Sequence, residues 1–229
     1  MKKTTTIILL FIAFYCSAYN LPTVEYKKYH FGFSLGINVL DFGLDQSMKV
    51  APDGNLYQGE VSTLMPGFNI GLIGDLRLNN YFNLRFTPTL MLGERTVNFM
   101  NNNTNDVFKS TVKSTIITFP VYLKYSAVRI QNYKPYLLLG GGYAIDLAHE
   151  QQQAILLNYH DFFVDFGIGT TFYLEYFRLS PEIKFAFGLS DLLTPWDKRT
   201  GFKEPDYQKY NNALSKITSQ FFTLTFHFE

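Results

Sequence analysis

Apolar and polar residues alternate along about eight segments of this chain, and the connections between the segments are alternately long and short. Successive side chains of a β-strand point to opposite faces, so this alternation gives each strand one apolar and one polar face. Connections of roughly ten to twenty-five residues follow the odd-numbered segments and turns of a few residues follow the even-numbered ones, a layout typical of outer-membrane barrels. The pattern predicts an all-β fold: an eight-stranded antiparallel up-and-down transmembrane β-barrel.

The first segment shows the two faces clearly. One face carries Tyr29, Phe31, Phe33, Leu35, Ile37 and Val39, and the other carries His30, Gly32, Ser34, Gly36 and Asn38. Such segments run to about 13 to 16 residues, whereas strands of soluble proteins are most often about 5 to 6 residues long. Beyond the N-terminal region no stretch approaches the roughly 18 apolar residues of a membrane helix, so a closed barrel is the expected mode of crossing a bilayer.

The first 18 residues have the features of a secretory signal peptide. Lys2 and Lys3 supply the positive start, residues 7–16 are apolar, and Cys16-Ser17-Ala18 resembles a cleavage site. We therefore expect residues 1–18 to be removed and residues 19–229 to form a single barrel domain. Lipidation of Cys16 is the less favoured alternative, because the preceding Tyr15 is bulky. Cleavage after Ala18 would remove the single cysteine of the chain.

The connections predict the orientation. The short turns are Asn79–Asn80, Gln131–Tyr133 and Glu175–Tyr176, and the long loops span residues 45–65, 100–110, 149–160 and 191–216. Long loops of such barrels face outward, which would place the protein in the outer membrane of a Gram-negative cell with both termini in the periplasm. A barrel of eight strands is only wide enough to be filled by side chains, so we expect no open channel.

Eight ionisable residues share the polar face of their segments. They are Asp75, Arg77, Arg85, Lys124, Asp165, Arg178, Glu182 and Lys184. Because an unpaired buried charge is costly, we expect them to form a packed network of ion pairs and hydrogen bonds in the lumen. A proton or ion path, or a groove for a polar substrate, is the alternative interpretation.

The sequence favours no catalytic, metal or cofactor site. The four histidines are scattered, and no pair has the spacing of metal ligands on one element. His149, Ser190 and either Asp161 or Asp191 lie near the expected outer rim, but their faces do not agree as a triad requires. A net charge of +1 argues against binding of nucleic acid. We therefore expect no enzyme, no cofactor, no metal and no small-molecule substrate.

Several segments resemble the PorT family. They are Tyr29–Asn38 with Asp41-Phe42, Pro66–Leu72 with Asp75–Leu78, Tyr81–Phe86, Leu92–Arg95, and Phe119–Ser126 leading to Pro135-Tyr136 and Gly140–Gly142. PorT-like proteins are outer-membrane barrels required for protein export by the type IX secretion system, often in gliding bacteria. The resemblance implies a non-catalytic component of that system, with outer-membrane lipids and other secretion-system subunits as partners. Glu229 departs from the terminal aromatic residue usual in outer-membrane barrels.

Trp196 and Tyr207 lie in the longest loop and are the candidate contact residues for a partner. Aromatic side chains near Arg and Lys are common interface anchors, although Trp196 is equally suited to the aromatic belt at a membrane surface. The alternative function is that of a small structural or adhesive barrel of the OmpX or OmpA type, without a secretion role.

Overall fold

The computed structural model describes residues 27–51, 54–61, 65–101, 106–148, 155–196, 199 and 207–229. The strands are β1 (Tyr29–Gln46), β2 (Tyr57–Val61), β3 (Pro66–Arg77), β4 (Phe82–Phe86), β5 (Thr89–Asn101), β6 (Val107–Ser126), β7 (Tyr133–Asp146), β8 (His160–Tyr173), β9 (Arg178–Gly188) and β10 (Leu214–Phe228). A short helix, α2 (Gln208–Ala213), precedes β10. In the part of the chain so described, no helix is long and apolar enough to span a membrane.

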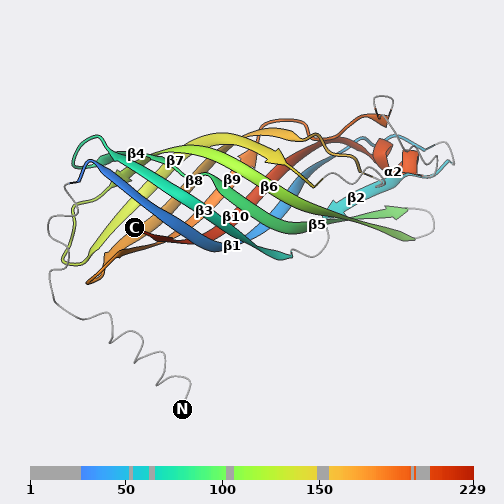
Figure 1. Ribbon diagram of the computed structural model, residues 1–229. Helices are drawn as coiled ribbons and strands as arrows, with labels where there is room; N and C mark the ends of the chain where they lie inside the picture. The colour runs from blue at the N-terminus through green and yellow to red at the C-terminus, as the bar shows by residue number, and fades with distance from the viewer. Residues whose placement is uncertain are drawn as a thin grey trace, which may run out of the picture.

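The strands close into a ring of antiparallel pairs. β1 pairs with β3 on one side and with β10 on the other. From β10 around the ring, the neighbouring strands are β9, β8, β7 and β6 in that order. β4 and β5 act as two parts of one ring strand, because both lie between β3 and β6. The break falls at Thr87 and Pro88, where Thr87 N–H donates to Pro120 O and Leu72 N–H donates to Pro88 O. The predicted eight-stranded up-and-down barrel is therefore confirmed (Figure 1).

The two ends of the barrel differ. At the turn end, short connections close on themselves, as where Leu78 N–H donates to Phe82 O and Leu174 N–H donates to Phe177 O. β1 begins and β10 ends at this turn end. At the opposite, loop end, the β5–β6 hairpin extends past its neighbours, β2 pairs with it along residues 97–101, and α2 lies beside it (Figure 1).

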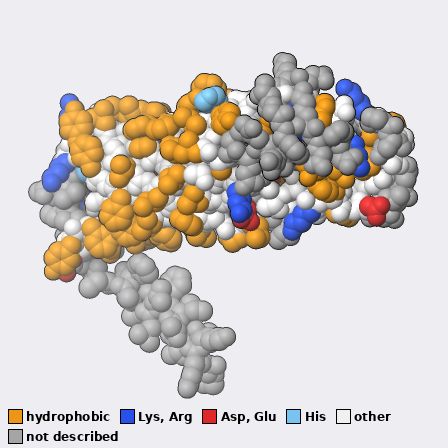
Figure 2. Space-filling model, turned by 45° about the vertical axis from the view of Figure 1, so that its right-hand side comes forward, with side chains coloured by type: hydrophobic (Ala, Val, Ile, Leu, Met, Phe, Trp, Pro, Cys, Tyr) orange, Lys and Arg blue, Asp and Glu red, His pale blue; other side chains and the backbone are white. Residues whose placement is uncertain are grey.

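Large apolar side chains cover the outside of the barrel wall (Figure 2). Members of this belt include Phe31, Phe33, Leu35, Phe68, Leu72, Phe119, Leu123, Leu139, Phe166, Ile168, Phe185 and Phe226, all of them exposed, with Phe31 as high as 75%. Toward the loop end the outward positions become polar, as at Lys109, Thr111 and Lys113 of β6. The strands are therefore long because they cross an apolar belt and then continue into water.

The glycine run of β7 lets neighbouring strands come close. Both ladders stay in register along it, without a bulge. A Cβ at Gly141 would lie 2.7 Å from Phe163 O, and one at Gly142 would lie 2.6 Å from Pro120 Cα. Larger residues would therefore push β7 away from β6 and β8, so this run serves the close packing of the wall.

Candidate functional site

The interior near the turn end holds a cluster of buried charges centred on Arg85. Its guanidinium is 0% exposed and contacts three carboxylates, Asp75 Oδ2 at 3.0 Å, Glu182 Oε2 at 3.0 Å and Glu229 Oε1 at 3.2 Å. These acids come from β3, from β9 and from the residue that follows β10. One arginine therefore ties together distant parts of the ring.

Other predicted lumen residues extend this cluster. Lys184 Nζ lies 3.3 Å from Glu182 Oε1, and Lys124 Nζ lies 3.8 Å from Asp75 Oδ2. The Tyr136 hydroxyl donates to Glu182 Oε2 at 2.9 Å, and Lys124 Nζ is 4.2 Å from the centre of the Tyr136 ring. Positive and negative groups alternate in space, which limits the cost of burying each of them.

Asp165 and Arg178 have partners outside the predicted set. Tyr122 donates its hydroxyl to Asp165 Oδ2 at 2.5 Å. Arg178 pairs with Glu229, whose side chain is 2% exposed. Glu229 was not predicted as a lumen residue, yet continued alternation past the outward Phe228 places it inward. That alternation is the signal by which it could have been found.

Arg77 is the member of the predicted set that the structure places differently. It is partly exposed, and its guanidinium donates to Asn79 O at 3.3 Å and to Asn80 Oδ1 at 2.7 Å. Because β3 ends at Arg77, the side chain lies at the rim and holds the β3–β4 turn. The expectation that it joins the buried cluster was wrong.

The middle of the lumen is apolar. Side chains from most ring strands meet there, namely Leu40, Met91, Ile116, Ala144, Phe163, Ala186 and Phe221. The Phe163 and Phe221 rings lie edge to face with their centres 6.3 Å apart. Cavities of about 10 Å³ border this layer, each large enough for about one water molecule. Closer to the loop end, Arg95 pairs with Asp146 at 3.0 Å and lies over the Phe42 ring.

A third layer, the cap, closes the loop end with apolar side chains from strands and loops. It consists of Phe42, Ala51, Tyr57, Val97, Phe99, Val112, Ile155, Leu157, Leu192, Leu193, Ala213, Leu214 and Ile217. The expectation of a polar interior therefore fails at this end. The outer face of the strands meets water here, so the inner face becomes an apolar core as in a soluble protein.

Aromatic rings cluster at the tip of the cap. Tyr210 stacks on Phe108 with ring centres 4.3 Å apart, and it also contacts Tyr57 and Phe99. Tyr207, a predicted contact residue, lies 5.9 Å from Phe108 between ring centres. α2 thus joins the loop before β10 to the projecting β5–β6 hairpin, and Tyr207 belongs to this aromatic cluster.

Trp196, the other predicted contact residue, pairs with Arg199. The Arg199 guanidinium lies 4.9 Å from the centre of the Trp196 ring, and Arg199 N–H donates to Trp196 O at 3.3 Å. Burial lowers the pKa of Arg199 to about 10, so it remains cationic at neutral pH. Nearby, Thr194 O accepts a hydrogen bond from Asn211 of α2. Trp196 therefore lies in the chain just after residues that pack in the cap.

The outer edge of β2 is protected by a side chain. Gln46 Nε2 donates to Gly59 O at 2.5 Å, and Gly59 N–H donates to Gln46 Oε1 at 3.1 Å. The amide of Gln46 thus takes the place of a neighbouring strand at Gly59. This arrangement reduces the tendency of an exposed edge to pair with another chain.

The residues considered for catalysis have structural partners. Asp161 Oδ1 accepts from Ser190 N–H at 3.3 Å, and Ser190 Oγ accepts from Phe162 N–H at 3.1 Å. Asp191 Oδ1 accepts from the N–H groups of Leu193 and Ile217. His149 lies outside the described residues. Among the residues that are described, no group of three or more His, Cys, Asp or Glu side chains could hold a metal ion.

An apolar belt around a closed antiparallel ring, with a filled interior, defines the class of small outer-membrane β-barrels. Residues 19–194 match the family model described as an outer membrane protein beta-barrel domain, and the chain belongs to this family. Its location is therefore the outer membrane. The family match and the fold establish this class, and neither shows the PorT family in particular.

Solved structures of small barrels are similar to this chain. Neisserial surface protein A is 10% identical, with a TM-score of 0.42, covering 88% of this chain and 98% of its own. OprG from Pseudomonas aeruginosa is 12% identical, with a TM-score of 0.43, covering 87% and 92%. Ail, the attachment invasion locus protein of Yersinia pestis, is 12% identical, with a TM-score of 0.39, covering 88% and 99%. A comparison with curated protein sequences finds no significant match.

Proposed function

We propose that this protein is a non-catalytic, structural or adhesive outer-membrane barrel of the OmpX or OmpA type, and that its cap binds a partner outside the cell. Both termini would then lie in the periplasm. The observation that carries the proposal is the combination of a lumen filled at three levels with strands that continue beyond the belt into a packed cap. A filled lumen leaves the exposed surfaces as the place of function.

The tip of the cap is the surface best suited to such binding. Tyr207 and Tyr210 are partly exposed and pack against Phe108, and Lys209 Nζ lies 5.2 Å from the centre of the Tyr210 ring. Trp196 is partly exposed as well, and its ring lies against the buried Arg199 guanidinium. Trp, Tyr and Arg are the residues that most often dominate binding energy at interfaces.

The filled lumen predicts that the protein does not conduct ions. Protein refolded into planar lipid bilayers should give no steady current in salt solution, because charged, apolar and cap layers each block the path. A channel-forming porin reconstituted in the same bilayers is the control. Sustained single-channel steps from this protein would contradict the sealed interior and reopen the ion-path interpretation.

Surface attachment should depend on the cap. In a deletion strain carrying the Trp196→Ser, Tyr207→Ser double variant, attachment should fall to the level of the deletion strain itself. Affinity falls by about tenfold for each 1.4 kcal/mol of binding free energy that is lost with an interface anchor. Lys113→Ser, on the polar outer wall of β6, is the matched control. Wild-type attachment by the double variant, at equal amounts in the outer membrane, would reject the cap as the binding surface.

A role in type IX secretion is the second candidate, and it is favoured by the PorT-like segments Tyr81–Phe86 and Leu92–Arg95. In that role the cap or the periplasmic turns would contact other subunits of the secretion machinery. Measuring export of cargo with C-terminal secretion signals separates the two candidates. Loss of export in the deletion strain supports the machinery role, whereas normal export with reduced attachment supports the adhesive role.

A further inference from the structure

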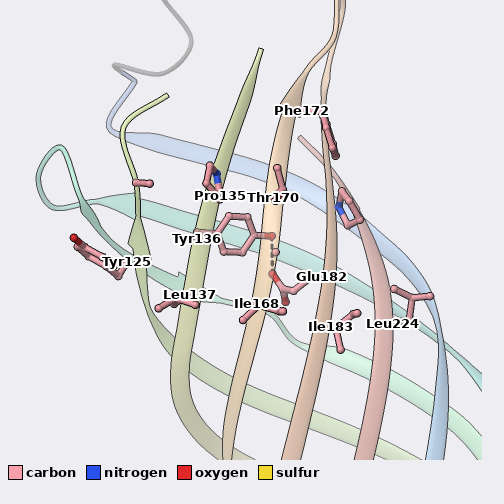
Figure 3. Close-up of a pocket in the computed structure, with 13 residues that line it drawn as sticks. Tyr125, Pro135, Tyr136, Leu137, Ile168, Thr170, Phe172, Glu182, Ile183 and Leu224 are labelled. Carbon is pink, nitrogen blue, oxygen red and sulfur yellow. Dashed lines mark hydrogen bonds between the residues drawn. The ribbon is translucent and has the colours of Figure 1, made fainter. Parts of the chain in front are cut away.

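A pocket opens in the outer wall of the barrel near the turn end (Figure 3). We call it the wall pocket; it has a volume of about 650 Å³ and lies between β7, β8 and β9. Leu137, Ile168, Ile183 and Leu224 line it, and Tyr125, Thr170 and Phe172 lie on the side nearer the turns. Because the wall around it belongs to the apolar belt, the wall pocket faces lipid hydrocarbon.

The wall pocket coincides with an interruption of the β8–β9 ladder. Pairing runs from Phe163–Gly188 to Gly169–Glu182 and resumes only at Phe172–Leu179. Continuing that register would place Thr170 opposite Pro181, while Thr170 is already opposite Pro135 on β7. Proline carries no N–H group, so two prolines flank one residue of the central strand.

This register leaves the Thr170 carbonyl without its ladder donor. Leu189 N–H donates to Phe162 O, so the even-numbered residues of β8 direct their backbone groups toward β9. Tyr173 N–H donates to Asn132 O, which directs the odd-numbered residues toward β7. Thr170 therefore faces Pro181, which has no hydrogen to donate. A carbonyl without its ladder donor in a lipid-facing wall requires another donor.

The floor of the wall pocket is sealed from the charged cluster. Gly169 has no side chain, and the Tyr136 ring fills the space, since a Cβ at Gly169 would lie 2.5 Å from the Tyr136 hydroxyl oxygen. That hydroxyl is engaged by Glu182, as the dashed line in Figure 3 shows. The polar group of the wall pocket that lacks its ladder partner is thus the Thr170 carbonyl, beside an outward-facing threonine hydroxyl.

We propose that the wall pocket binds one phospholipid with a primary ammonium headgroup, such as phosphatidylethanolamine, from the leaflet at the turn end. An acyl chain would lie against Leu137, Ile168 and Ile183, and the ammonium would donate to Thr170 O. The mouth of the wall pocket lies at the level of the lipid headgroups, because Tyr125 lies beside it and aromatic residues mark the membrane surface. This lipid site is independent of what the cap binds.

Native mass spectrometry of the refolded full chain tests the proposal, with phosphatidylethanolamine and phosphatidylcholine of identical acyl chains as probes. Phosphatidylcholine has no N–H, so losing one hydrogen bond should weaken its retention by about fivefold. Ile168→Trp should reduce phosphatidylethanolamine binding by at least about tenfold by filling the pocket. Leu72→Trp is the control, because Leu72 is 65% exposed on β3, outside the pocket. Heat-dependent mobility on gels verifies that each variant is folded.

Pro181→Ala tests the hydrogen bond specifically. Alanine restores an N–H opposite Thr170, so the carbonyl gains a ladder donor and the preference for phosphatidylethanolamine over phosphatidylcholine should disappear. Equal retention of both lipids by the wild type would overturn the proposal, and so would full binding by Ile168→Trp. A protein dimer that Ile168→Trp abolishes would likewise overturn it and assign the wall pocket to a second copy of the chain.

Discussion

Replacing Arg85 by methionine should lower the free energy of unfolding by about 3 to 5 kcal/mol, or prevent refolding altogether. The guanidinium is 0% exposed and forms ion pairs with Asp75, Glu182 and Glu229 at once. Methionine fills similar space but leaves these acids facing one another with fewer cations. Urea titration of the protein in lipid vesicles, followed by tyrosine fluorescence and gel mobility, measures the loss.

Two variants make the Arg85 experiment specific. Arg77→Met removes an arginine that is partly exposed at the turn, and its effect should stay below about 1 kcal/mol. Arg85→Lys keeps the charge but should still lower the free energy of unfolding more than Arg77→Met does. A compact ammonium cannot contact three carboxylates at once as the planar guanidinium does. Equal costs for Arg85→Met and Arg77→Met would show that the buried cluster does not hold the ring together.

Replacing Phe99 by alanine should destabilise the cap by about 3 to 5 kcal/mol, the usual cost of removing a buried phenylalanine. Phe99 is 0% exposed and packs with Tyr210 of α2. Because the cap lies beyond the apolar belt, we expect it to open while the membrane-spanning ring stays closed. Limited proteolysis of reconstituted protein should therefore cleave within the cap and leave a protected fragment of the belt.

Val107→Ala is the matched control on the same projecting hairpin. Val107 is 55% exposed, so the change removes little buried surface and should cost less than about 0.5 kcal/mol. Proteolysis of Phe99→Ala at the wild-type rate would mean that the cap does not depend on its apolar core. Complete unfolding of Phe99→Ala would mean that cap and ring form one cooperative unit.

The barrel was predictable because its signals are local. A period of two in hydrophobicity, strands too long for a soluble sheet, and alternating connection lengths each depend on neighbouring residues. The break at Thr87 and Pro88 did not disturb the prediction, since the outward and inward faces keep their order on both sides of it. The belt residues of the first segment, such as Phe31, Phe33 and Leu35, were assigned to the correct face for the same reason.

The cap was harder to predict. Leu156, Leu157, Leu192 and Leu193 lie in connections that read as polar loops, yet all four are buried. Their burial depends on how far the β5–β6 hairpin projects and on α2 packing against it. The inner faces of the strands are charged near the turn end and apolar in the middle layer and the cap, and no local pattern marks the height at which this change occurs.

The sequence alone determined which segments are strands, how many there are and which side chains face outward, because the alternation of apolar and polar residues is a property of each segment by itself. The meeting of Arg85 with Glu182 and Glu229 was not determined in this way, since these partners are 97 and 144 positions away. Ring closure sets the height of every strand relative to the others, and that height selects which charges pair, excludes Arg77, and places Thr170 between two prolines. Such long-range registers belong to the folded ring as a whole.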